Sequence, residues 1–233
     1  MRIAIRPPEY FPNAAYLALL MHVDHFVLAD TFQYSHKSLH NRARLRNPQG
    51  WQWVTVPLRG TQHHRAIREV EISDRRKWPR SHWRAFMYNY RSTMCFEFFE
   101  DDLAPIFEKR WERLGPLTCA TTELLAEFLE LETRLVRASD LDDAPDDVPG
   151  VLAALGTGDD AELIAPLDAA RHDAAFAPVV RAFHFEGERY RQNFEGFEPE
   201  MTAADLIFNY GPEARSHLRQ GARLEAVTPP PAS

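Results

Sequence analysis

The stretch RIAIRPPEYFPNAAYLALLMHVDHFVLADTFQYSHKSLHNRARLR, residues 2–46, decides the fold. It opens with a short apolar run at residues 3–5, which ends at a pair of prolines. The apolar spacing of residues 14–21 predicts a helix, and a second apolar run at residues 25–28 predicts another strand. Strand, helix and strand, with polar residues after both strands, is how an open α/β sheet presents a binding crevice. The alternative is an ordinary βαβ unit with a polar loop.

Outside this stretch, apolar patterns continue to alternate between strand and helix periods. Strands are predicted at residues 50–58, 67–72, 133–137, 162–165 and 179–185. Helices are predicted at residues 78–96, 101–114, 116–131, 151–155, 206–210 and 214–218. We therefore predict an α/β fold with a mainly parallel sheet, helices on both faces and a helical insertion at about residues 78–131. Residues 1–225 are expected to form one domain, and the proline-rich tail 226–233 is expected to be disordered.

Length and composition limit the class of protein. A chain of 233 residues is long enough to bury a sizeable core, and its two cysteines indicate no disulfide framework. No apolar run reaches the roughly twenty residues that span a bilayer, and the first residues do not resemble a signal peptide. We therefore expect a cytoplasmic protein that does not insert into a membrane.

Charge is distributed unevenly along the chain. Residues 36–91 hold thirteen Lys or Arg against three Asp or Glu, although the whole chain has a formal net charge of −7. Arginine suits bidentate contact with phosphate and carboxylate groups. The middle of the chain therefore predicts a face that binds a small anionic ligand, the alternative being that the acidic remainder neutralises it within the fold.

Several common catalytic arrangements are missing from the sequence. No histidine or cysteine spacing suits a metal site, and no G-x-S-x-G elbow surrounds a serine. Neither a Walker loop nor a G-x-G-x-x-G motif occurs. We expect neither a metal nor a cofactor.

A cluster of polar side chains is the better candidate site. Two tyrosines follow the first strand and a donor-rich segment follows the second, so the two sets converge if they share one sheet edge. The candidates for binding substrate in this cluster are Tyr10, Tyr16, Gln33, Asn41, Arg42 and Arg44. Lys37 and the two arginines would neutralise a phosphate or developing negative charge. The alternative is that Asp30 and Asn41 mainly fix turns and Tyr10 packs.

The candidates for catalysis are Asp30, His82 and Lys37. Asp30 or His82 would act as the general base for an attacking amine or hydroxyl. The helix predicted from residue 78 also places Tyr90 and Arg91 in the basic half of the chain, where they would project into the site.

Several segments resemble the WbqC-like protein family. They are IRPPEYFP (residues 5–12), DTFQYSHK (30–37), NRAR (41–44), WVTVP (53–57) and DLIFNYGP (205–212). The resemblance implies a bacterial protein connected with surface-polysaccharide (O-antigen) synthesis, and a transferase that moves an amino-acyl or acyl group onto a phosphorylated or nucleotide-linked sugar. It adds Tyr190, Gln192, Asp205 and Asn209 to the candidate substrate-binding residues. Asp205 and Asn209 lie one helical turn apart, so the alternative is that they cap the helix end at Gly211.

The sequence also departs from the family pattern. The family typically has glutamine at Pro7, glycine at Ala15, a His-Pro step at Glu186-Gly187 and a Ser-Gly-Pro-rich loop at residues 164–171. Loss of glycines removes close backbone approach to a ligand. A second hypothesis is therefore a non-catalytic member that binds a nucleotide or sugar phosphate.

Nucleic-acid binding is a third hypothesis. Trp51, Trp53, Trp78 and Trp83 are interleaved with arginines and would form a stacking platform. The acidic total charge and the lack of a binding motif weigh against this hypothesis.

Overall fold

A computed structural model of the chain describes residues 1–36, 38–74, 77–157, 161–167, 169 and 181–226. Its centre is a six-stranded sheet in the order β5-β2-β1-β6-β7-β8. The strands are β1 (Arg2–Arg6), β2 (His25–Leu28), β5 (Arg134–Arg137), β6 (Glu162–Pro166), β7 (Arg181–Phe185) and β8 (Ala222–Ala226). All neighbouring pairs are parallel except β7 with β8. The predicted α/β fold with a mainly parallel sheet is confirmed.

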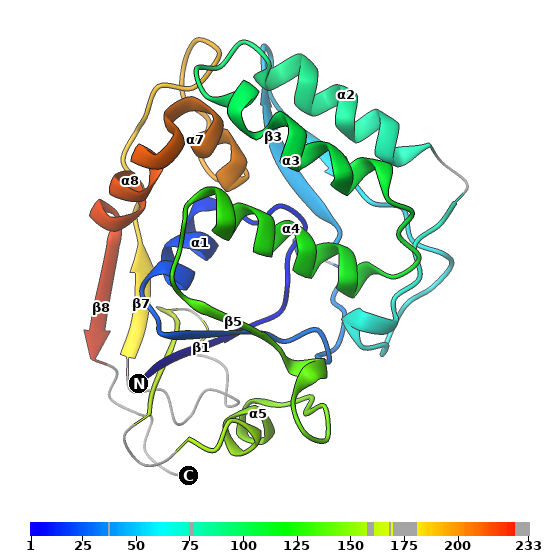
Figure 1. The fold of residues 1–233 in the computed structure, drawn as a ribbon, viewed down its shortest axis with the longest axis vertical. Coiled ribbons are helices and arrows are strands. Elements are labelled where there is room, and N and C mark those ends of the chain that lie inside the picture. The colour runs from blue at the N-terminus through cyan, green and yellow to red at the C-terminus, as the bar shows by residue number, and fades with distance from the viewer. Residues whose placement is uncertain (37, 75–76, 158–160, 168, 170–180, 227–233) are drawn as a thin grey trace.

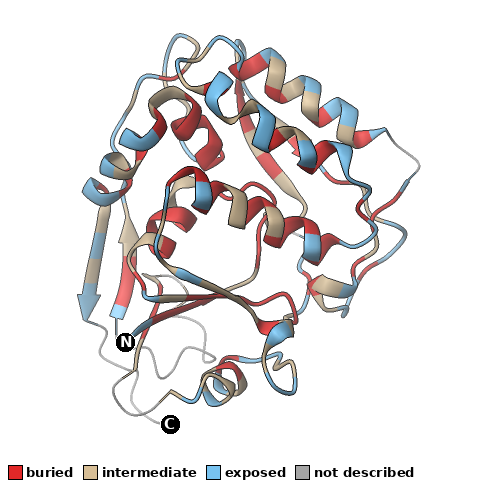
Figure 2. Cartoon of the chain, viewed as in Figure 1, coloured by how far each residue is buried: buried red, intermediate tan, exposed pale blue. Residues whose placement is uncertain are grey.

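Helices cover both faces of the sheet (Figure 1). Ala4 and Phe26 face the core that contains α1 (Ala14–Met21), α4 (Leu114–Phe128), α7 (Ala203–Tyr210) and α8 (Ala214–Gln220). Ile3 and Val27 point the other way and pack against α5 (Val148–Ala154). Because β1 is buried on both faces, its apolar run is continuous instead of alternating with polar residues. Figure 2 shows the contrast with the largely exposed edge strand β8.

Three consecutive helices form the predicted insertion, with boundaries that differ from the prediction. They are α2 (Trp78–Tyr90), α3 (Phe96–Glu108) and α4. The helix expected at residues 78–96 ends at Tyr90, whose carbonyl accepts a hydrogen bond from the Thr93 hydroxyl at 2.7 Å. This side-chain bond satisfies a carbonyl at the helix end, and the chain turns into α3.

The strands β3 (Arg42–Asn47) and β4 (Gly50–Thr55) form a separate antiparallel hairpin. Residues 41–44 were expected in a loop, so this expectation is wrong from Arg42 onward. Alternating apolar and arginine side chains explain the strand. Ala43 and Leu45 are buried in the core, and the arginines at positions 42, 44 and 46 are on the opposite face of the strand.

The prediction of a strand at residues 67–72 is also wrong. A short 3-10 helix, Ile67–Glu69, forms there, followed by isolated bridges at Glu71 and Ile72. Ile67 and Val70 are both buried, and the backbone of Arg68 packs against Gly115 at the start of α4. A Cβ atom at Gly115 would lie 2.5 Å from Arg68 Cα, so the close approach requires glycine.

Two further 3-10 turns are described, Ala138–Asp140 and Gly211–Glu213. The tail expected to be disordered was residues 226–233, but Ala226 ends strand β8, and residues 227–233 lie outside the described residues. Lys37 and most of residues 168–180 also lie outside them. Over the described ranges, no helix is both long and apolar enough to cross a membrane.

Candidate functional site

The strand order reverses direction at the centre of the sheet. From β1 the chain adds β2 and β5 on one side, and then crosses to the other side to add β6 and β7. In open α/β sheets, ligands bind outside the carboxyl ends of the strands at such a switch point. A cavity of about 380 Å³ lies at this place, which we call the edge crevice. It is lined by Arg6, Glu9, Asn13, Ala15, Tyr16, Leu19, Pro166, Leu167, Phe183, His184 and Phe185.

An arginine and a glutamate dominate the chemistry of the edge crevice. β1 ends at Arg6, and the chain turns through Pro7 and Pro8 so that Glu9 lies beside it, with Nη2 and Oε1 3.2 Å apart. Glu9 is only 8% exposed. Glu9 Oε2 and Arg6 Nε are buried without a hydrogen-bond partner among the described residues. Buried polar atoms are normally paired, so two orphaned atoms on side chains that line the same cavity are an argument for a ligand there.

Burial shifts the protonation of the groups around this pair. Burial raises the pKa of the Glu9 carboxyl above its usual range, and the charge of Arg6 opposes that rise. His40 is also buried, and burial together with the Arg6 charge lowers its pKa to about 4. His40 is therefore neutral at pH 7, and Arg6 remains the cation of the crevice.

Tyr16 and the start of α1 fix the shape of the crevice. The Tyr16 hydroxyl donates to the Pro7 carbonyl at 3.1 Å, and the Arg6 guanidinium lies 5.5 Å from the Tyr16 ring centroid. Asn13 caps α1 by accepting a hydrogen bond from the Tyr16 backbone N–H at 3.0 Å. The amino end of α1, with its partial positive charge, therefore faces the same cavity as Arg6.

Four of the predicted substrate-binding residues come together, but away from the edge crevice. Tyr90, Tyr190, Gln192 and Asp205 form a buried network around Arg46. Gln192 accepts from Arg46 Nε at 3.0 Å and donates to Asp205 Oδ2 at 3.0 Å, and Tyr190 donates to the same oxygen at 2.6 Å. Burial raises the pKa of Asp205 to about 6, against these hydrogen bonds and the Arg46 charge.

The remaining predicted binding residues are dispersed. Tyr16 lines the edge crevice. Arg42 and Arg44 lie on the hairpin, with guanidinium carbons 4.5 Å and 5.0 Å from the Trp53 ring centroid. Gln33 and Arg91 are exposed. The others use their side chains within the fold: Asn41 donates to Val56 O, Asn209 donates to Asp205 O, and the Tyr10 hydroxyl lies 2.9 Å from His82 Nδ1.

Two of the three residues predicted for catalysis, Asp30 and His82, make hydrogen bonds to different parts of the fold. Asp30 accepts a hydrogen bond from the Ser139 N–H at 3.0 Å, beyond the end of β2. His82 is buried beside Tyr10, and burial lowers its pKa to about 4. Lys37 lies outside the described residues. Their catalytic roles stay predictions.

Sequence reasoning missed Arg6, Glu9, His40 and Arg46 as site residues. Arg6 and Glu9 fall within the segment that carries the family resemblance, and a signal was present in opposite charges placed three residues apart across a Pro-Pro turn. No comparable signal marked Arg46. It is one of three arginines at alternate positions, and the other two, Arg42 and Arg44, are partly exposed, so the sequence does not show that Arg46 is buried.

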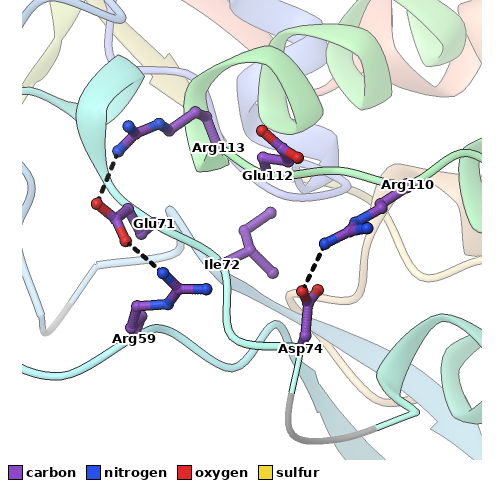
Figure 3. A pocket seen from close by; sticks show the side chains of 7 residues that line it. All are labelled: Arg59, Glu71, Ile72, Asp74, Arg110, Glu112 and Arg113. Carbon is purple, nitrogen blue, oxygen red and sulfur yellow. Dashed lines mark hydrogen bonds and ion pairs between the residues drawn. The ribbon is translucent and has the colours of Figure 1, made fainter.

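A polar cavity of about 240 Å³ elsewhere on the surface, between Arg59 and Arg110, is explained by surface ion pairs (Figure 3). Glu71 pairs with Arg59 at 3.2 Å and with Arg113 at 3.2 Å, and Asp74 pairs with Arg110 at 2.9 Å. These charges neutralise one another, and exposed ion pairs of this kind have small energetic effects. We assign this cavity no ligand.

A search for metal ligands gives nothing within the described ranges. No group of three or more His, Cys, Asp or Glu side chains there is arranged to hold a metal ion.

Comparison with known proteins gives the family. The model of the WbqC-like protein family matches residues 7–217. The chain is also 32% identical over 226 residues to the uncharacterized protein Rv1507c of Mycobacterium tuberculosis, covering 94% of this chain and 97% of that protein. No solved structure matches the chain. The protein therefore belongs to the WbqC-like family, as the sequence motifs indicated.

The buried histidines predict a loss of stability in acid. The pKa of His82 falls from 6.5 to about 4 on folding, and His40 behaves in the same way. Above pH 6.5 both histidines are neutral in the folded and the unfolded chain, so they do not change the free energy of unfolding with pH. Between pH 6.5 and 4 the unfolded chain binds more protons, so the free energy of unfolding falls by about 1.4 kcal/mol per pH unit for each histidine. Asp205, whose pKa is raised on folding, gives the opposite slope from about pH 4 to 6.

Urea unfolding of wild type and His82→Gln between pH 4.5 and 7.5 isolates the histidine. We expect the free energy of unfolding of the variant to depend less steeply on pH. The slope should fall by up to about 1.4 kcal/mol per pH unit, the value for one bound proton. Parallel curves for the two proteins would show that His82 is not held neutral in the core.

Proposed function

We propose that this WbqC-like protein is a cytoplasmic transferase of surface-polysaccharide or related glycoconjugate synthesis, with its reaction centre in the edge crevice. It moves an amino-acyl or acyl group onto a phosphorylated or nucleotide-linked sugar. The observation that carries the proposal is the Arg6–Glu9 pair, which lies at the switch point of the sheet with one unpartnered polar atom on each side chain.

Arg6 supports the choice of an anionic acceptor. Its guanidinium is the cation that lines the crevice among the described residues, and its Nε is a donor without a partner there. Guanidinium groups bind phosphate oxygens through two parallel hydrogen bonds. The amino end of α1 on the same cavity favours negative charge as well.

Glu9 supports an acyl-transfer step. The acceptor amine or hydroxyl attacks the carbonyl carbon of the donor, the bond to the leaving group breaks, and Glu9 takes the proton of the nucleophile at Oε2. A raised pKa brings a carboxylate closer to the range in which a general base works at neutral pH. Arg6 keeps enough of the carboxylate ionised for this role, because its charge opposes the effect of burial.

A non-catalytic binding protein is the second candidate. The same arginine would hold a nucleotide or sugar phosphate without turnover, and the departures from the family pattern favour this reading. The nucleic-acid hypothesis has less support, because Trp78 is buried and Trp83 packs against the core, which leaves only Trp51 and Trp53 of the expected platform on the hairpin.

A thermal-shift screen tests the proposed site. Nucleotides, nucleotide-sugars and sugar phosphates are added to wild type, Arg6→Ala, Arg6→Lys and the control Arg110→Ala, which removes an exposed arginine elsewhere. A ligand at one hundred times its Kd stabilises the protein by about 2.7 kcal/mol. We expect this shift in wild type and Arg110→Ala, its loss in Arg6→Ala, and partial retention in Arg6→Lys.

Retention of the full shift in Arg6→Ala would place the anion elsewhere. A ligand whose binding falls steeply between low and moderate salt, together with binding of single-stranded DNA, would favour the nucleic-acid hypothesis instead.

A further inference from the structure

A second cavity shares a wall with the edge crevice. It has a volume of about 240 Å³ and lies between the start of α1, the loop after β7 and α8. Asn13, Ala15 and Phe185 line both cavities, so a ligand in one is next to a ligand in the other. We call this second cavity the aromatic pocket.

Aromatic rings form much of its wall. Phe185, Tyr190, Phe197 and His217 line it. The Tyr190 ring packs edge-on against Phe197 at 5.4 Å between centroids and lies 6.3 Å from the His217 ring. Tyr190 is also fixed by its hydrogen bond to Asp205, so the pocket wall is attached to a buried network instead of a free loop. Rigid aromatic walls bind apolar and cationic groups at low entropic cost.

The charged side chains that line the pocket are negative, and the Arg189 guanidinium lies 6.0 Å from the Phe197 ring centroid. Glu188, Glu198 and Glu200 line it, and its described lining contains no lysine or arginine. Glu200 is paired with Arg44 at 2.8 Å, which leaves Glu188 and Glu198 without an ion-pair partner among the described residues. The two unpaired carboxylates that line the pocket therefore favour a cation over an anion, whereas the edge crevice attracts anions through Arg6.

One polar atom in the wall also lacks a partner. His217 Nδ1 is buried and makes no hydrogen bond among the described residues. In the tautomer that carries its proton on Nε2, this nitrogen accepts a hydrogen bond, so a donor on a ligand would satisfy it. A protonated amine supplies both the donor and the charge that the carboxylates favour.

We propose that the aromatic pocket binds a small organic cation, a primary ammonium attached to an apolar or aromatic body. Aromatic faces together with carboxylates recognise such groups through cation–π attraction and charge. Assigning this cation to the amino-acyl half of a donor rests on the proposed function. The binding of the cation itself does not, because it requires neither turnover nor Arg6.

NMR titration with phenethylamine tests the proposal, and 3-phenylpropionate serves as the matched anion with the same ring and a similar length. We expect phenethylamine to shift the backbone amides of Gly187 and Phe197 in a saturable way. 3-Phenylpropionate should bind the pocket at least roughly tenfold more weakly. Equal binding of the two probes would show an apolar pocket without charge selectivity and would overturn the proposal, as would the absence of saturable shifts at these amides.

Variants separate the contribution of the aromatic rings to phenethylamine binding from that of the carboxylates. Phe197→Ala and Glu188→Gln should each weaken phenethylamine binding several-fold, whereas Phe98→Ala and Glu97→Gln, the same changes at exposed positions on α3, should leave it unchanged. Loss of binding in the α3 controls, or none in the pocket variants, would overturn the assignment. Arg6→Ala should keep phenethylamine binding while losing the anion, so failure of the proposed function is distinguishable from failure of this inference.

Discussion

Replacing Arg46 with alanine is expected to lower the free energy of unfolding by about 3–5 kcal/mol. Arg46 is only 2% exposed, and it donates to Gln192, to the Gly50 carbonyl at 2.6 Å and to the Glu195 carbonyl at 2.5 Å. Alanine removes the guanidinium donor from these acceptors, although Gln192 Oε1 keeps its bond from the Glu198 N–H, and it leaves Asp205 without the nearby positive charge. Removing one member of a buried charged network is costly because the groups left behind have already lost their water.

Arg44→Ala is the matched control, two residues earlier on the same face of β3. Its ion pair is with Glu200, whose side chain is 70% exposed, so we expect a loss of no more than about 1 kcal/mol. Urea unfolding at pH 8 and pH 5 measures both variants. The cost of Arg46→Ala should be smaller at pH 5, because Asp205 then takes up a proton. Similar costs for the two arginines would contradict the buried network.

Replacing Glu9 with glutamine is expected to lower kcat/KM by about 10²- to 10⁴-fold once a substrate pair is identified. The amide has the same shape as the carboxyl group and still accepts a hydrogen bond from Arg6, but it cannot take a proton from the nucleophile. Ligand binding by thermal shift should change little, because Arg6 carries the contact with the anion. A large effect on turnover with little effect on binding is what a general base predicts.

Glu123→Gln controls for the loss of a carboxylate. Glu123 pairs with Arg137 at 2.8 Å on the other side of β2, away from the edge crevice, so its replacement should leave turnover unchanged. Full activity of Glu9→Gln would exclude Glu9 as the base and return attention to Asp30 and His82. Ligand binding by wild type with no turnover of any donor would favour the non-catalytic alternative.

The centre of the α/β sheet was predictable because β1 and β2 are buried on both faces. The continuous apolar runs at residues 3–5 and 25–28 need no partner information to be recognised, and the helix between them sets a parallel connection. The family was predictable for a different reason, since its motifs are contiguous in the chain. Boundaries were less predictable, because the end of α2 is accompanied by local hydrogen bonds from the Thr93 N–H and hydroxyl to the Tyr90 carbonyl.

The hairpin shows what local pattern leaves open. Arg42, Arg44 and Arg46 are the same residue type at alternate positions, so local sequence pattern predicts the same exposure for all three. Packing of the loop at residues 192–195 over one end of β3 buries Arg46 and leaves Arg44 beside an exposed glutamate. Contacts between segments about 150 residues apart decided this difference, so no window of sequence contains it.

The candidate site, too, was predictable in part from the sequence and in part only from tertiary packing. The sequence by itself determined the parallel part of the sheet, the helices on both of its faces and the polar residues that follow the strands, but not the antiparallel edge strand β8. Only the tertiary structure decided which polar residues meet at the switch point, because this depends on where β6 and β7 pair beside β1. That pairing places Arg6, Glu9 and Tyr16 around one cavity, and it sends Tyr190, Gln192 and Asp205 into a buried network. Burial then raises the pKa values of Glu9 and Asp205, because the cost of placing a charge away from water depends on neighbours that only the folded chain supplies.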